Sequence, residues 1–311
     1  MREDPIDPLA EVVSLLRPGV RYTKVVGGAG HWGVRRAETG QPSYCVILEG
    51  SCRLAVEGEC EGNDALTLMP GDFVLIPATW NFAMSSMQAP DERDFERQPT
   101  MLQPGEFRHG IQDGPLDVRF IIGHCVFESP DAALLVSLLP RLVHVRGEQR
   151  LATLVQLVND EARAQRPARG IVMTRLLEVL LIEALRGAAG SGTPPGLVRG
   201  LADARLAAAL RCMHEAPAHA WTVAELAREA ALSRSAFFER FSEAVGAAPM
   251  AYLLAWRMAL AKDLLRRGAC SIAEVAERVG YSSASTFSVA FARHIGQPPA
   301  RYARARELVQ S

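Results

Sequence analysis

The stretch GYSSASTFSVAFARHIGQPPARY, residues 280–302, decides how the C-terminal part of this chain folds. It carries Phe287 and Phe291 four residues apart, a spacing that places both rings on one face of a helix. Nearly the same pattern occurs about fifty residues earlier, in LSRSAFFERFSEAVGAAPMAY at residues 232–252. At an offset of 50, the matching residues are Phe237, Phe241, Gly246, Pro249 and Tyr252 with Phe287, Phe291, Gly296, Pro299 and Tyr302. The sequence therefore predicts two copies of one helical unit.

Each copy is typical of a short helix, a tight turn and a second helix. Four hydroxyl side chains stand where N-caps are expected: Thr222 and Ser271 before the first helices, Ser233 and Ser283 before the second. The first two each have a Glu three residues later, which completes a capping box. We interpret residues 222–245 and 271–294 as two helix-turn-helix motifs, whose second helix can enter a major groove. A helix from about Pro249 to Arg267 joins them and would set their separation, so that both can reach successive grooves about 34 Å apart.

In this repeat the chain resembles the AraC/XylS family of bacterial transcription regulators. The signature of that family is a tandem helix-turn-helix ending in Gly-[small or polar]-x-Pro-x-x-Tyr, and this sequence contains GAAPMAY and GQPPARY. The resemblance covers residues from about 200 to 306. It implies an all-α domain at 197–306 that binds double-stranded promoter or operator DNA, with RNA polymerase as a further partner.

The resemblance also implies which side chains face DNA. By position they are Arg234, Ser235, Phe238, Glu239 and Arg240 in the first copy and Ala284, Ser285, Thr286, Ser288 and Val289 in the second, with Arg293 near the DNA backbone. Two of these depart from the family, which often has Arg where Glu239 and Val289 stand. Glu239 can accept a hydrogen bond from cytosine N4 and Val289 can contact a thymine methyl group. The second copy would then contribute more to positioning the protein on DNA than to recognising a base sequence.

The charge distribution agrees with a nucleic-acid-binding C-terminal part. Residues 197–311 contain 15 Lys and Arg against 10 Asp and Glu, a net charge of +5, whereas the remaining residues have a net charge of −6. Four basic residues lie on or beside the connecting helix: Arg257, Lys262, Arg266 and Arg267. Each is a candidate phosphate contact, and the alternative for each is ordinary solvated surface.

Residues 1–128 are predicted to form an all-β barrel preceded by a helix at about Asp7–Leu16. The runs YCVILEG, CRLAV and LTLMPGDFVLIP alternate apolar residues and are separated by turn residues such as Gly50 and Pro70-Gly71-Asp72. The two runs YCVILEGSCRLAVEG and LTLMPGDFVLIPA resemble the two half-motifs of a cupin. The resemblance implies a cupin-type sensor domain of the kind fused to many AraC-type regulators.

The sensor domain is expected to bind a small-molecule effector and to lack a metal or other cofactor. Cys45 and Phe82 occupy the positions where enzymatic cupins have metal-binding histidines, and the remaining histidines have no ligand spacing. An apolar barrel with a few polar groups is the usual form of a small-molecule pocket. The candidate lining residues are Trp32, Tyr44, Cys45, Trp80, Phe82, Met84, His109 and His124, each of which could instead simply fill the barrel.

Other functions remain open from the residues alone. Cys45, Cys52 and Cys125 all fall on expected strands, so that a cysteine-based redox-responsive regulator is an alternative, provided that one thiol is accessible and has a lowered pKa. A cupin enzyme with a DNA-binding tail is a weaker alternative, because the metal histidines are absent. A repair sensor that accepts alkyl groups on a metal-held cysteine would require a cysteine cluster, and no such spacing occurs. We therefore expect a regulator that is not an enzyme.

Residues 129–190 are expected to be a helical dimerisation and linker region, followed by a flexible Gly/Ser/Pro linker at 187–196. Helices expected at 148–164 and 171–186 carry apolar faces too broad for one side of a surface helix. A second copy of the chain would cover such a face and make a homodimer, and the alternative is packing on the chain's own barrel. Neither a signal peptide nor a membrane-spanning run is apparent, so we expect a cytoplasmic protein without a membrane partner.

Overall fold

The computed structural model describes residues 7–36, 42–57, 65–77, 81–88, 90–127, 129, 132–136, 139–164, 166–188, 195–268 and 270–304. The chain divides into two compact units, which are described separately. One unit contains the strands together with the helices α2, α4 and α5, and we name it the barrel unit. The other contains α1, α3 and α6 to α13, and we name it the helical unit. This agrees with the expected combination of a β-rich cupin domain and a helical DNA-binding domain.

Within the described residues, the strands of the barrel unit form two sheets. The strands are β1 (Pro18–Ala29), β2 (Gly33–Arg36), β3 (Ser43–Gly50), β4 (Cys52–Val56), β5 (Leu66–Leu68), β6 (Phe73–Ile76), β7 (Phe82–Ser85), β8 (Thr100–Gln103), β9 (Glu106–Gly110), β10 (Val118–Phe127) and β11 (Val143–Val145). The larger sheet has the order β11-β6-β3-β10-β1-β9-β8, and the smaller one has the order β2-β7-β4-β5. Alternate residues of both sheets meet in one apolar core, which includes Ile47, Leu54 and Phe120.

The expected turns shape the barrel unit. Gly71 has a φ of +86°, which an L residue rarely adopts, and the Asp72 carboxylate accepts a hydrogen bond of 3.0 Å from the Met69 backbone N–H. At the end of β3, Gly50 has a φ of +69° and its backbone lies against Asp117, so closely that a Cβ would fall 1.8 Å from the Asp117 carbonyl oxygen. Both turn predictions are confirmed.

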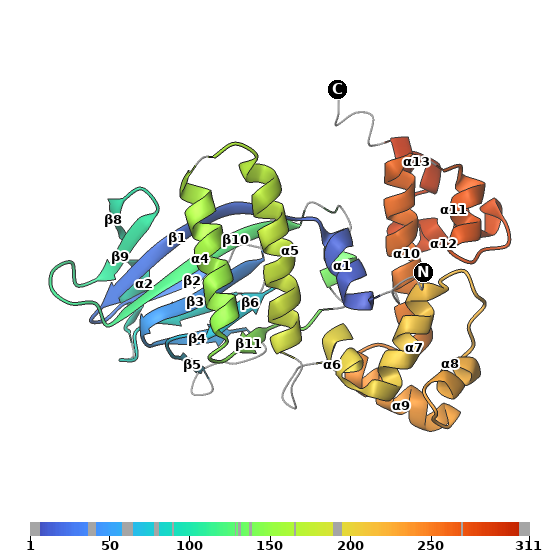
Figure 1. The fold of residues 1–311 in the computed structure, drawn as a ribbon, viewed down its shortest axis with the longest axis horizontal. Coiled ribbons are helices and arrows are strands. Elements are labelled where there is room, and N and C mark those ends of the chain that lie inside the picture. The colour runs from blue at the N-terminus through green and yellow to red at the C-terminus, as the bar shows by residue number, and fades with distance from the viewer. Residues whose placement is uncertain are drawn as a thin grey trace. The chain divides into compact units, whose positions relative to one another are not determined.

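Two long helices, α4 (Gln149–Ala164) and α5 (Arg169–Gly187), lie side by side across one face of the larger sheet (Figure 1). Their apolar residues are buried against strands that include β1 and β3. The broad apolar face that suggested a dimer interface is therefore covered by the chain's own sheet, as the intramolecular alternative required. A short helix, α2 (Glu92–Glu96), packs beside β2.

The helical unit contains the repeat. Its helices are α1 (Pro8–Leu16), α3 (Ala132–Val136), α6 (Leu197–Ala202), α7 (Ala204–Glu215), α8 (Val223–Glu229), α9 (Arg234–Val245), α10 (Pro249–Arg267), α11 (Ile272–Arg278), α12 (Ala284–Ile295) and α13 (Pro299–Arg304). Helices α8 and α9 form the first helix-turn-helix and α11 and α12 the second, with α10 between them (Figure 1).

The local predictions for the repeat are confirmed. Thr222 and Ser271 form capping boxes with Glu225 and Glu274, and the side chains of Ser233 and Ser283 accept hydrogen bonds from the first turns of α9 and α12. The four aromatic rings that define the repeat, Phe237, Phe241, Phe287 and Phe291, are each fully buried.

The sequence assigns α1 to the sensor domain at 1–128, and that domain boundary stays a prediction. In the structure α1 clusters with the C-terminal helices, where the Glu11 carboxylate lies 2.8 Å from His214 Nδ1 of α7. Its apolar residues Leu9, Val12 and Val13 are buried. An amphipathic helix can cover any complementary surface, and the sequence of α1 does not specify which one.

No single helix among the described residues is long and apolar enough to cross a membrane, although α9 and α10, bent by 54°, pass that test of length and composition as a pair.

Candidate DNA-binding interface and effector pocket

The second recognition helix, α12, presents a continuous exposed face. Ser285, Thr286, Val289 and Arg293 all lie on the side opposite the buried Phe287 and Phe291. Val289 is 71% exposed, which is unusual for a side chain with no polar atom to hydrate. Ala284 and Ser288 are only half-buried, and the Ser288 hydroxyl donates to the Ala284 carbonyl oxygen at 2.7 Å. The structure thus brings four of the predicted residues into one face and leaves two at its margin.

A groove of about 920 Å³ runs along this face. It is lined by Leu254, Tyr281, Ser285, Thr286, Val289, Ala290, Arg293 and His294. The lining combines hydroxyl groups, one guanidinium and apolar side chains, which are the groups that contact bases, phosphates and thymine methyls. Four lining residues were not among the predicted ones: Leu254, Tyr281, Ala290 and His294. Leu254 belongs to α10, and only tertiary packing brings it to the groove.

The first recognition helix, α9, exposes a mixed surface. Arg234, Ser235, Phe238 and Glu239 are all exposed, and Phe238 is 46% exposed although it is a large apolar ring. Arg234 has no ion-pair partner in the part of the chain that the structure describes. The four side chains are therefore available to a ligand.

Arg240, the fifth residue predicted for this helix, is bound within the unit. Its Nε donates to the carboxylate of Asp203, which caps the N-terminus of α7. Burial tends to raise the pKa of Asp203, but the hydrogen bonds from Arg240 and from the Arg205 and Leu206 backbone N–H groups together lower it. Arg240 therefore joins α9 to α7 in this structure.

The four basic residues of α10 also interact within the helical unit. Arg257 donates to two backbone carbonyl oxygens, and Arg267 Nε lies 2.7 Å from the carboxylate of Asp263. Arg266 Nη2 lies 3.9 Å from the same carboxylate, and Lys262 Nζ lies 5.4 Å from the centre of the Tyr302 ring. These contacts favour a structural role over phosphate binding for all four.

Similar proteins agree with this arrangement. Residues 7–190 match a Cupin family and residues 226–305 match a Helix-turn-helix domain, while residues 206–243 also match the bacterial regulatory proteins of the tetR family. An AraC-like transcription regulator of Streptomyces lividans is 34% identical over 303 residues, which cover 96% of this chain and 98% of that protein.

The chain belongs to the AraC family of DNA-binding transcription regulators. A second relative, RclR of Escherichia coli, an RCS-specific transcriptional activator, is 32% identical over 264 residues and 84% of each chain. Among solved structures, this AraC-family chain is similar to the DNA-binding domain of AdpA in complex with a target DNA, with 31% identity, a TM-score of 0.31, and coverage of 32% of this chain and 90% of that one.

In the barrel unit of this AraC-family regulator, Trp32 is one of the residues predicted to line an effector pocket. It is only 2% exposed and belongs to the apolar core with Cys45 and Met84, against which Phe82 also packs. The indole lies on the backbone of Gly28, where a Cβ would come within 2.4 Å of Nε1. His109 lies beside it, with 5.9 Å between ring centres. The indole N–H is buried without a hydrogen-bond partner among the described residues.

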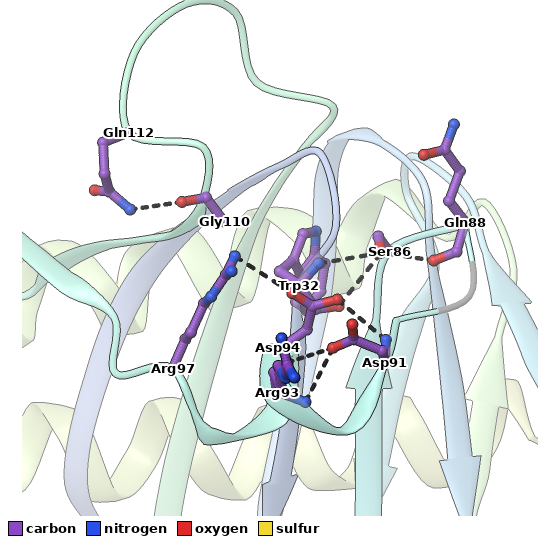
Figure 2. A network of polar contacts seen from close by, with 9 residues as sticks. All are labelled: Trp32, Ser86, Gln88, Asp91, Arg93, Asp94, Arg97, Gly110 and Gln112. Carbon is purple, nitrogen blue, oxygen red and sulfur yellow. Dashed lines mark hydrogen bonds and ion pairs between the residues drawn. The ribbon is translucent and has the colours of Figure 1, made fainter.

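A polar network fixes the backbone around Trp32 (Figure 2). The Ser86 backbone N–H donates to the Trp32 carbonyl oxygen at 3.0 Å, and the Trp32 backbone N–H donates to the Ser86 hydroxyl at 3.3 Å. Beside them, Asp91 and Asp94 form the capping box of α2. The indole is thus held in place by its own backbone, while its N–H stays unused.

The remaining predicted pocket residues are dispersed. Tyr44 points to the opposite face of the larger sheet, where it stacks on Phe73 with 6.4 Å between ring centres. His124 lies near the other end of β10, with Nδ1 3.0 Å from the Ser43 hydroxyl. Trp80 lies outside the described residues. The structure therefore brings together Trp32, Cys45, Phe82, Met84 and His109, and separates Tyr44 and His124 from them.

Cys45, Cys52 and Cys125, the barrel cysteines that the structure describes, do not form an accessible thiol site. Burial raises the pKa of Cys45 well above its ordinary value, and burial raises the pKa of Cys52 and of Cys125 to about 12. Cys45 and Cys52 face the core, whereas Cys125 lies on the opposite face of the sheet and its Sγ is 3.6 Å from the Pro42 carbonyl oxygen. Cys125 therefore cannot pair with either of the others without a rearrangement. Within the described residues, no group of three His, Cys, Asp or Glu side chains is arranged to hold a metal ion.

The helical unit contains a buried hydrogen-bonded network around His214, which the sequence did not predict. His214 lies 2.8 Å from Glu11 Oε2 through Nδ1 and 2.8 Å from the Tyr252 hydroxyl through Nε2. It stacks on Trp256 with 4.0 Å between ring centres. The pKa of His214 is lowered because burial disfavours the charged ring, an effect that outweighs the neighbouring carboxylates of Glu11 and Asp7.

Proposed function

We propose that this regulator binds two elements of promoter DNA per chain and that a small molecule in the barrel unit controls this binding. The observation that carries the proposal is the pair of capped recognition helices, α9 and α12, each with one buried aromatic face and one exposed face suited to a major groove. Regulation of transcription at a bacterial promoter implies RNA polymerase as a partner and a cytoplasmic location. The relatives are regulators, which supports a protein without enzymatic activity.

Roles for the DNA-facing residues follow from their chemistry. Arg234 and Arg293 supply cations for phosphates or guanines, and Ser235, Ser285 and Thr286 supply hydroxyl groups. Glu239 accepts from cytosine N4, and the exposed Val289 contacts a thymine methyl group. Ala284, Ser288, Phe238 and Arg240 shape or position these surfaces.

The effector is proposed to be a small and largely apolar molecule that carries one hydrogen-bond acceptor. The buried indole N–H of Trp32 would donate to that acceptor, because a buried donor without a partner costs about 1–3 kcal/mol. His109 and the apolar side chains of Met84 and Phe82 would line the same space.

We propose a homodimer that forms through the outer face of α5. Ile171, Arg175, Glu178 and Ile182 lie on one stripe with alternating spacings of four and three residues, and Ile171 is 70% exposed. An antiparallel second copy would pair Arg175 with Glu178 of the partner and Ile171 with Ile182 of the partner. The stripe is therefore complementary to itself in charge and in the pairing of its apolar residues, as a twofold interface requires.

The proposed DNA binding is tested by selecting sites from random DNA with the full-length protein. We expect an enriched sequence with two elements about one helical turn apart and an affinity that falls steeply with salt. Arg234→Ala should weaken binding and flatten the salt dependence, whereas Arg21→Ala, on the exposed surface of β1, should change neither. The absence of any enriched sequence, with and without candidate effectors, would count against the proposal.

A further inference from the structure

One guanidinium on the connecting helix binds the backbone in front of the first helix-turn-helix. Arg257 Nε donates to the Pro217 carbonyl oxygen at 2.7 Å, and Arg257 Nη2 donates to the His219 carbonyl oxygen at 2.7 Å. Both carbonyls belong to the segment between α7 and α8. Hydrogen bonds to a charged donor are stronger than neutral ones, so this contact ties the segment firmly to α10.

The segment that Arg257 binds has its own internal restraints. Trp221 Nε1 donates to the Ala216 carbonyl oxygen at 3.0 Å, and the His219 backbone N–H donates to the same oxygen at 3.1 Å. The His219 and Trp221 rings meet edge to face, with 4.3 Å between their centres. A displacement of this segment would therefore be passed on to α8, which begins directly after it.

The same guanidinium touches the turn of the second helix-turn-helix. Gly280 has a φ of +83°, and a Cβ at that position would lie 2.9 Å from Arg257 Nη2 and 2.8 Å from the Ala218 carbonyl oxygen. Burial raises the pKa of the neighbouring Tyr281, and the charge of Arg257 opposes that shift. The backbone of the second turn thus packs directly on the segment that Arg257 holds.

We infer that Arg257 is a positioning residue that fixes the separation and relative orientation of the two recognition helices. The two helix-turn-helix motifs are attached to opposite ends of α10, so their mutual orientation depends on the contacts made along that helix. At Arg257, the segment that precedes the first motif, α10 and the turn of the second motif meet around one side chain. This inference rests on the proposed function, because a fixed separation matters for two DNA elements read by one chain.

The positioning role of Arg257 can be tested without DNA. Nitroxide labels are attached through p-acetylphenylalanine introduced in place of Glu239 and Val289, which are exposed on the two recognition helices. Double electron–electron resonance then gives the distribution of distances between the labels in the full-length protein, with an excess of unlabelled protein so that only pairs within one chain contribute. We expect one narrow distribution, which Arg257→Met broadens. Arg257→Lys should give an intermediate width, because an ammonium group lacks the rigid fork of donors that spans both carbonyls. The matched control is Arg267→Met, which removes a guanidinium that pairs with Asp263 on the same helix.

The second measurement uses unlabelled protein and the selected DNA site. One base pair is added or removed between the two elements, and the affinity is compared with that for the original spacing. We expect the wild type to lose about tenfold or more, since each element would be displaced from its groove, and Arg257→Met to lose less than about threefold. If Arg257→Met does not fold, Gly280→Ala disturbs the same contact from the other side, and a broadened or displaced distribution is expected.

The results separate this inference from the proposed function. An unchanged distance distribution and unchanged spacing discrimination in the variants overturn the inference. If the wild type selects no DNA, the proposed DNA binding fails. The distance distributions alone then support or overturn the positioning role of Arg257.

Discussion

At the scale of single residues, Val289 offers a test of base recognition. Its exposed isopropyl group should contact the C5-methyl group of one thymine in the selected site. Val289→Ala should then cost about 1 kcal/mol of binding free energy, because it removes two methyl carbons from that contact. Replacing the thymine by deoxyuridine should cost the wild type a similar amount and the variant almost nothing. Additive losses in a double-mutant cycle of protein and DNA would show that the two groups do not touch.

His214 makes the stability of the helical unit sensitive to acid. Its pKa in the folded protein lies below the ordinary value of about 6.5, so the unfolded chain binds a proton more readily. The contribution of the neutral His214 ring to the free energy of unfolding is therefore fully present above about pH 6.5. It declines as the pH falls towards and through the folded pKa, by at most about 1.4 kcal/mol per pH unit. Urea unfolding at pH 5, 6 and 7 should show a shallower decline for His214→Gln than for the wild type. The exposed His31 gives the control, since His31→Gln should keep the wild-type decline.

The thiols of Cys45, Cys52 and Cys125 should be unreactive in the folded protein. A pKa of about 12 at Cys52 and Cys125 leaves roughly one thiolate in ten thousand at pH 8. Alkylation followed by peptide mass spectrometry should therefore modify the half-buried Cys212 and Cys270 before Cys45, Cys52 or Cys125. Fast modification of any of these three in the folded chain would restore the redox-responsive alternative.

At the scale of elements, prediction from sequence succeeded where the signal is local. The capping boxes at Thr222 and Ser271 and the aromatic pairs at i and i+4 lie within a few residues, so each helix of the repeat could be derived from its own segment. The contact between α1 and His214 joins residues 203 positions apart, and no pattern in either segment specifies it. The same reason explains why Arg240 and Arg257 were candidates for DNA contact: their partners Asp203 and Pro217 lie 37 and 40 residues away.

The outer stripe of α5 can be tested by exchanging its charges. Arg175→Glu and Glu178→Arg should each place like charges opposite one another across the antiparallel interface and dissociate the dimer. The double variant should restore opposite charges and therefore the dimer, which analytical ultracentrifugation would measure. Within one helix the exchanged pair keeps its i, i+3 spacing, so the stability of α5 itself should change little in the double variant. Failure of the double variant to dimerise, with a folded barrel unit, would exclude this register.

At the scale of the whole molecule, the proposed function assigns DNA recognition to the helical unit and control by an effector to the barrel unit. In the barrel unit the polar network fixes the backbone at Trp32, whose indole N–H has no hydrogen-bond partner among the described residues, while in the helical unit side chains of α10 hold the repeat together. A regulator of this kind responds to a ligand only through a difference in binding free energy between two arrangements. The proposed dimer would enlarge that difference, because it would couple two DNA-binding domains to two effector-binding domains.

This division predicts how dimerisation contributes to DNA binding. On DNA with two copies of the selected site, the wild-type dimer binds its second site as an intramolecular event, which can raise affinity by a factor of 10²–10⁴. Arg175→Glu should lose most of that gain on two-site DNA and should bind one-site DNA as tightly as the wild type, since α5 belongs to the barrel unit and not to the DNA-contacting face. Titration of both DNAs with both proteins gives the four affinities. Equal losses of affinity on one-site and two-site DNA would mean that the substitution damages the helical unit itself. Four equal affinities, for both proteins on both DNAs, would mean that the two DNA-binding domains act independently.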